Sequence, residues 1–111
     1  MRTAVAKSLS RQYIDRVLQM PELQHGAVRI GLWLVGAAEQ KGGFPVEAHQ
    51  TSFIFGLNRN GINVPGISIR PETIVKSLDA LESAGLLTVE DGTEVKGGHT
   101  SKLYTLHLDE E

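Results

Sequence analysis

The feature that most constrains this fold is a helix that has to end at a glycine, followed by two segments of alternating apolar residues. Residues 70–108 read RPETIVKSLDALESAGLLTVEDGTEVKGGHTSKLYTLHL. Pro71 suits the first helical position, because its missing N–H would have no intrahelical partner there. Gly85 suits the left-handed residue that follows a helix, and Leu86 can fold back on the last turn in the hydrophobic contact of a Schellman motif. The sequence therefore predicts a helix over residues 71–84.

This predicted helix has one apolar face and one polar face. At about 100° per residue, Ile74, Leu78 and Leu81 share a narrow arc, with Val75 at its edge. The opposite side carries polar or small residues, namely Glu72, Thr73, Lys76, Ala80 and Ser83. We expect the apolar face to pack against the core and the other face to meet a partner.

The two segments after the helix alternate as half-buried strands do. Leu87 and Val89 alternate with polar residues, and the apolar positions of residues 103–108 recur at every second residue. The residues between them, 91–101, are rich in glycine and lie next to basic side chains. We predict two paired strands joined by a flexible loop over residues 91–101.

Composition indicates a single soluble domain. A chain of 111 residues is long enough to bury its own core without disulfides or a structural metal. Apolar residues make up 41% and charged residues 22% of the chain, which is neither a disordered nor a membrane composition. There is no cysteine, which excludes thiol chemistry and agrees with a reducing cytoplasm. We expect one cytoplasmic domain over residues 1–111, with no signal peptide and no membrane span, because the longest apolar run, 30–38, is far shorter than the ~20 residues that a span requires.

Two further helices are predicted before this stretch. Residues 3–20 form an amphipathic pattern with Leu9, Tyr13 and Val17 on one stripe, and the segment is locally basic. Its basic side chains form either a solvated face or a phosphate contact. Residues 22–41, which follow Pro21, are apolar on most sides, so we expect them to form the central buried helix, with its tryptophan in the core.

The C-terminal third resembles a known DNA-binding family. The run ETIVKSLDALESAGLL resembles the recognition helix of winged helix-turn-helix proteins. The run KGGHTSKLYTL resembles the glycine-rich wing and closing strand of small plasmid or phage replication and regulatory proteins. This resemblance implies an α+β winged helix-turn-helix fold, mostly helical, with a C-terminal β-hairpin wing and an extra N-terminal helix.

The middle of the chain matches that family less closely. Residues 44–46 suit a short first strand, and residues 50–57 suit either a buried strand or a short helix, of which the architecture requires the helix. Residues 58–68 contain Asn-Gly and Pro-Gly pairs and are predicted to be a loop. That loop is longer than the turn of about three or four residues in a compact helix-turn-helix. Arg59 and Asn60 in it suit either a phosphate contact or a plain surface position.

No catalytic or metal-binding pattern is present in the sequence. The four histidines lack ligand spacing, and no cysteine accompanies them. There is no phosphate-binding G-x-x-x-x-G-K-[ST] motif and no serine in a nucleophile elbow. Glu72 and Asp79 lie near Lys76, a spacing typical of a solvated row of salt bridges. We therefore expect neither an enzyme nor a cofactor-binding protein.

The resemblance assigns DNA contacts to specific positions. Exposed residues of the recognition helix enter the major groove in this family, and the wing lies along the backbone or minor groove. The implied contact residues are Arg70, Glu72, Thr73, Lys76 and Ser77 on the helix, and Lys96, His99, Thr100 and Lys102 on the wing. Basic side chains suit guanine O6 and N7, threonine suits a base edge or thymine methyl, and glutamate suits cytosine N4. Phosphates would be met by the wing lysines and by the N–H groups of Gly97 and Gly98.

Net charge and size bear on this hypothesis. The formal charge is −2, whereas nucleic-acid-binding domains are often basic. The tail at 109–111 is acidic, and without it 11 basic side chains stand against 10 acidic ones. A single reading helix gains contacts when two copies bind a palindrome, so we expect a homodimer. Residues 1–20 are the expected dimerisation element.

The sequence therefore favours a sequence-specific double-stranded DNA-binding protein. The expected role is a small transcriptional regulator or an accessory replication or partition factor of a mobile element, and the mobile element rests on the resemblance alone. The competing hypothesis is a winged-helix module that binds protein, which the acidic balance permits. A third and more distant alternative is a fragment of a larger replication initiator.

Overall fold

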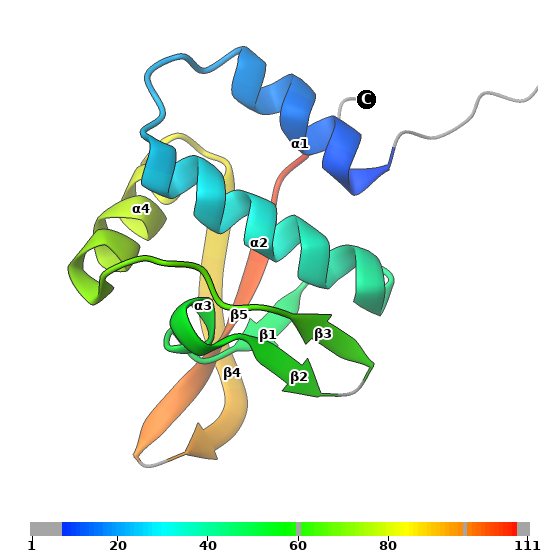
Figure 1. The fold of residues 1–111 in the computed structure, drawn as a ribbon, viewed down its shortest axis with the longest axis vertical. Helices are drawn as coiled ribbons and strands as arrows, with labels where there is room; N and C mark the ends of the chain where they lie inside the picture. Colours follow the sequence, from blue (N-terminus) through cyan, green and yellow to red (C-terminus); the bar gives the residue numbers. More distant parts are fainter. Residues whose placement is uncertain (1–7, 60, 97, 109–111) are drawn as a thin grey trace, which may run out of the picture.

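The computed structural model is a mixed α+β fold built on four helices and a three-stranded antiparallel sheet (Figure 1). It describes residues 8–59, 61–96 and 98–108. In chain order the elements are α1 (Leu9–Leu18), α2 (His25–Lys41), β1 (Val46–Ala48), α3 (Ser52–Phe55), β2 (Leu57–Arg59), β3 (Ile62–Val64), α4 (Pro71–Ser83), β4 (Leu87–Lys96) and β5 (His99–Leu106).

Helix α4 confirms the predicted start and the glycine stop. Pro71 is the first helical residue. The N–H of Gly85, at φ 77°, donates to Glu82 O at 3.0 Å, and the N–H of Leu86 donates to Leu81 O at 3.0 Å. Those two hydrogen bonds define a Schellman motif, in which the last carbonyls of the helix are satisfied. Leu81 and Leu86 are both fully buried, so the stop also contributes to the core.

The central position of α2 is also confirmed, although its start is not where we predicted it. The helix contacts α1, α4, β1, β3 and β5, and most of its apolar residues are buried. Trp33 is buried, packs edge to face on Phe53 with ring centroids 4.7 Å apart, and donates from Nε1 to Pro65 O at 2.8 Å. The predicted start at residue 22 was wrong, because residues 20–23 form a turn and Gln24 is extended at ψ 160°.

Helix α1 packs directly on α2. Tyr13 is 1% exposed, and its hydroxyl donates to Val28 O at 2.8 Å. A Cβ on Gly31 would overlap the Tyr13 ring, so glycine is required where the two helices meet. Burial raises the pKa of the Tyr13 phenol well above its ordinary value, and burial raises the pKa of Tyr104 to about 12. The part of the predicted helix before residue 8 lies outside the described residues.

The sheet has the order β1-β5-β4, with all neighbours antiparallel. The predicted alternation is confirmed at its buried positions, where Leu87, Tyr104 and Leu106 face the core. Val46 pairs with Tyr104 and Ala48 with Lys102, so β1 covers the middle of β5. This strand starts where the predicted strand 44–46 was expected to end.

Two segments predicted as loops are β-hairpins. Residues 91–101 are mostly strand, since Val95 pairs with Thr100 and Lys96 with His99, so the flexible loop was a wrong prediction. A register shift between Asp91 and Val95 interrupts the alternation there, which is why the pattern did not indicate a strand. Residues 57–64 form a second hairpin, β2–β3, in place of the predicted loop. The helix expected within 50–57 is present as the single turn α3.

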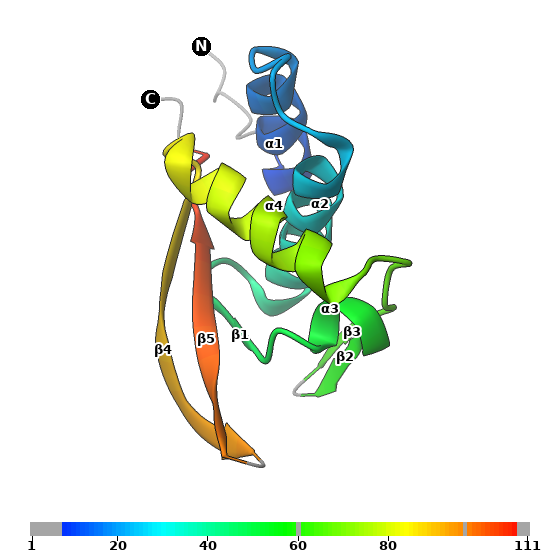
Figure 2. The same cartoon turned by 90° about the vertical axis from the view of Figure 1, so that its left-hand side faces the viewer.

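Helix α1 and the β4–β5 hairpin lie towards opposite ends of the molecule, and the short helix α3 lies beside the β2–β3 hairpin (Figures 1 and 2). Helix α1 lies at one end, and the β4–β5 hairpin extends beyond the helices at the other (Figures 1 and 2). Helix α4 lies beside the hairpin where the strands begin and end (Figure 2). The β2–β3 hairpin is attached to α2 by Gln40, which donates to Asn63 O at 3.0 Å and accepts from Asn63 N at 2.6 Å. The segment that leads into α4 is thus attached to α2 through the β2–β3 hairpin.

The Tyr13 contact provides the first prediction. Replacing Tyr13 with alanine removes a buried aromatic ring and leaves a cavity, so we expect a loss of about 3 to 5 kcal/mol in the free energy of unfolding. Leu32→Ala on α2 is the control, because Leu32 is 47% exposed and its truncation should cost about 1 kcal/mol or less. Urea denaturation followed by tryptophan fluorescence measures both. Equal losses would contradict the assignment of α1 to the core through Tyr13.

Candidate nucleic-acid interface

The outer face of α4 presents three of the predicted helix residues to solvent. Arg70, Glu72 and Lys76 are all exposed. The closest approach of Arg70 to Glu72 is 3.9 Å, at the limit of an ion pair, and both side chains are largely solvated. These three residues are therefore accessible to a partner.

The other two predicted helix residues face α2. Ser77 is only 5% exposed, so its prediction as an exposed contact residue is wrong, and Thr73 is half-buried. A Cβ on Gly26 of α2 would lie 2.6 Å from Ser77 Oγ and 3.1 Å from a Thr73 methyl carbon. At about 100° per residue, position 77 lies next to the buried positions 74 and 81, which accounts for its burial. Thr73 lies at the border between the packed and the open face.

The charge of the open face is acidic along most of its length. Glu72, Asp79 and Glu82 are exposed there, against the single ammonium group of Lys76. Lys76 itself lines a shallow hollow with Glu22, on the side of α4 that faces the connection between α1 and α2. The middle and end of the helix are thus unfavourable to phosphate, whereas at its start the charge of Glu72 stands beside that of Arg70.

The β4–β5 hairpin places three of the predicted wing residues on one strand. His99 and Thr100 are exposed at the start of β5, and Lys102 is half-buried further along it. Lys102 lies directly across from Asp91 of β4, and its Nζ contacts the carboxylate at 2.6 Å. The remaining wing predictions fall outside what the structure describes, namely the side chain of Lys96 and the whole of Gly97.

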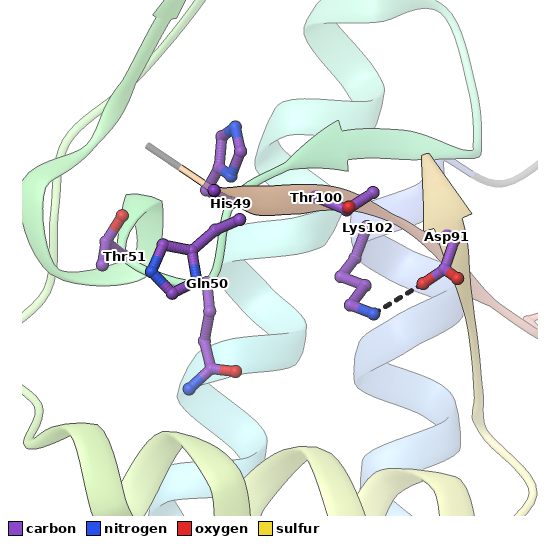
Figure 3. A pocket seen from close by; sticks show the side chains of 8 residues that line it. His49, Gln50, Thr51, Asp91, Thr100 and Lys102 are labelled. Carbon is purple, nitrogen blue, oxygen red and sulfur yellow. Dashed lines mark hydrogen bonds and ion pairs between the residues drawn. The ribbon is translucent and has the colours of Figure 1, made fainter. Parts of the chain in front are cut away.

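The predicted wing residues line a hollow that the sequence did not indicate. The hollow, about 630 Å³, lies between the hairpin and the turn before α3 (Figure 3). Its lining residues come from three segments that are distant in sequence, namely His49, Gln50, Thr51, Asp91, Gly98, His99, Thr100 and Lys102. His49 Nε2 is buried and has no hydrogen-bond partner among the described residues. Polar groups able to donate or accept hydrogen bonds therefore converge on this surface.

Glu47 holds the irregular part of the hairpin in place. Its carboxylate accepts from Ser101 Oγ at 2.6 Å and from the Thr93 N–H at 3.0 Å, so it spans from β1 across β5 to β4. A Cβ on Gly92 would lie within 2.5 Å of a Glu47 carboxylate oxygen, which explains the glycine at the register shift. This carboxylate thus ties the irregular part of β4 to β1 and β5. Only the pairing of β1 with β5 reveals this role, and no local pattern around Glu47 indicates it.

The described residues contain no cluster of three or more histidine or acidic side chains with the geometry of a metal site. Within the same residues, none of the helices has the length and apolar character needed to cross a bilayer. No protein-family profile, curated protein or solved structure matches the chain.

The Glu47 contacts provide the second prediction. Glu47→Gln keeps the size of the side chain but removes one charged acceptor, so we expect a loss of about 1 to 3 kcal/mol in the free energy of unfolding. Amide hydrogen exchange should accelerate over residues 91–101 more than in α2. Glu90→Gln, at an exposed position of β4, is the control and should change neither quantity appreciably. Uniform acceleration over the whole chain would contradict a local role for Glu47.

Proposed function

We propose that this protein is a winged helix-turn-helix protein that binds double-stranded DNA in a sequence-specific manner. The observation that carries the proposal is the arrangement of α4 and the β4–β5 hairpin. The helix has an open outer face, and the hairpin projects beside it from a sheet of order β1-β5-β4 (Figure 2). An exposed helix fits the major groove, and a projecting hairpin follows the backbone next to it.

The two parts of this surface have different tasks in the proposed complex. Arg70 and Lys76 contact base edges or nearby phosphates from α4, and Thr73 contributes from the border of its open face. The hairpin contributes His99, Thr100 and Lys102, whose contacts fix the position of the protein on the duplex. Ser77 has no part in it, because the side chain is buried against α2. The proposed role remains a small transcriptional regulator or an accessory replication or partition factor of a mobile element.

One observation favours a second candidate function, the binding of a protein partner. Three carboxylates against one ammonium on the open face of α4 repel a polyanion and suit a basic protein surface. Val75, which is 47% exposed, adds apolar area on the same helix. The two candidates use the same helix, and they differ in the charge of the partner.

Salt dependence of DNA binding tests the proposed function directly. A mobility-shift titration with DNA from upstream of the chain's own coding region should yield binding that weakens linearly in log salt. Lys76→Ala and Lys102→Ala should each reduce the slope, by up to about one unit for each phosphate that the variant no longer neutralises. Glu39→Gln on α2, which bonds to Ser10 of α1, is a charge-changing control away from the proposed face. Absence of binding at low salt, together with retention of a basic protein partner, would establish the second candidate instead.

The proposed complex contains two copies of the chain, joined through α1. Leu18 is 76% and Ile14 44% exposed on this helix, which leaves apolar area for a second copy. Because Tyr13 is part of the core, deleting residues 1–20 would unfold the protein rather than isolate a monomer. The double variant Ile14→Glu/Leu18→Glu avoids that problem.

Analytical ultracentrifugation tests the dimer. The unaltered protein should sediment as a dimer and the double variant as a folded monomer, since two buried carboxylates per copy would lack partners in the interface. Circular dichroism checks that the variant retains its helices. The matched control is Val75→Glu on α4, which should leave the dimer intact. A dimer that survives the double substitution would exclude α1 as the interface.

A further inference from the structure

A third hollow lies where α2, α4 and the segment before α4 meet. It has a volume of about 570 Å³ and is lined by Gly26, Arg29, Ser68, Ile69, Arg70 and Thr73. Two of these six residues are arginines, and both are exposed. They come from positions 41 residues apart in the chain, so the fold and not the sequence brings them to one hollow.

The close approach of α2 and α4 creates this arrangement. Gly26 allows the helices to meet, because a Cβ there would lie 2.6 Å from Ser77 Oγ. Arg29 follows Gly26 by three residues and therefore lies on the same face of α2, next to the start of α4. Arg70 is the residue immediately before α4, in extended conformation at ψ 150°. Each guanidinium group is thus carried by backbone that is held by helix packing.

The charge balance of this hollow is opposite to that of the rest of α4. Arg29 forms no ion pair with any other described residue. The Arg70 guanidinium group lies 3.9 Å from the Glu72 carboxylate, a distance at the limit of an ion pair. Asp79 and Glu82 lie further along α4 and outside the hollow. The positive end of the proposed interface is therefore the start of α4 together with α2.

We propose that this hollow binds a backbone phosphate of the DNA, with Arg29 as a contact residue beside Arg70. A guanidinium group presents parallel N–H donors that match two phosphate oxygens, which makes arginine well suited to this role. The inference rests on the proposed function and adds α2 to its interface. It also fixes how the duplex lies, because a phosphate between α2 and α4 places the duplex at the first turns of α4 and away from its acidic end.

The experiment compares Arg29→Gln with a matched control on the same helix. Lys41→Gln removes one positive charge from the last turn of α2, at the end of that helix far from α4 (Figure 1). Each variant is titrated with duplex DNA at several salt concentrations. Arg29→Gln should lower the slope of log affinity against log salt by about 0.9 and weaken binding equally for all sequences. Lys41→Gln should leave the slope unchanged, and Arg29→Lys should restore part of it.

Three outcomes separate this inference from the proposed function. If the unaltered protein does not bind DNA, both proposals fail together. If it binds DNA and Arg29→Gln has the slope of Lys41→Gln, the phosphate contact is refuted and the proposed function stands. If Arg29→Gln changes discrimination between sequences but not the salt slope, Arg29 contacts bases, and the inference is again overturned. Thermal unfolding controls for folding, and the exposed position of Arg29 predicts no change.

Discussion

The fold depends on how closely other elements can approach α2. This helix has three glycines, Gly26 in its first turn and Gly31 and Gly36 in its interior, where each costs about 1 kcal/mol relative to alanine. Two of them lie at helix contacts, since Gly26 meets α4 and Gly31 meets the ring of Tyr13, whereas Gly36 has no neighbour within 4 Å. Side chains at the two contact positions would push α1 and α4 outward and open the core. The low helix propensity of α2 is therefore offset by close helix packing, which glycines at the contact positions allow.

The same contact determines which residues of α4 can meet a partner. With α4 held against Gly26, Ser77 is buried and Thr73 is only partly accessible, while Glu72 and Lys76 remain open. The β4–β5 hairpin is oriented separately, through the carboxylate of Glu47 and its bonds to Ser101 and Thr93. The packing of α4 on Gly26 positions the helix part of the proposed interface, and the hydrogen bonds of Glu47 position the hairpin part. The β2–β3 hairpin adds a third restraint, because Trp33 and Gln40 attach the segment before α4 to α2.

The elements predicted correctly are those whose sequence patterns involve only neighbouring residues. The Schellman stop at Gly85 and the alternation in β5 depend on neighbouring residues, and both were predicted correctly from the sequence. The β2–β3 hairpin was missed because the Asn-Gly and Pro-Gly pairs were both interpreted as loop signals, although Asn60-Gly61 between two alternating segments is a hairpin signal. The pairing of β4 with β5 was predicted correctly, but the continuation of both strands through residues 91–101 was not, because the register shift near Gly92 breaks the alternation. The hollow beside His49 joins three distant segments and has no sequence pattern of its own.

The negative charge on α4 is the main argument against a DNA partner. The arrangement of the helices weakens this argument, because it allows a duplex to contact only part of α4. Asp79 and Glu82 follow the first two turns of the helix, so a duplex that contacts only those turns stays further from both carboxylates, and electrostatic repulsion falls with distance and with salt screening. Arg29 and Arg70 lie at the start of α4, and the hairpin residues line a separate hollow of the proposed interface. A duplex engaged at the start of the helix therefore meets two guanidinium groups together with the Glu72 carboxylate, and stays away from Asp79 and Glu82. A protein partner has no such restriction and would use the whole face, which is why the position of contact along α4 distinguishes the two candidate functions.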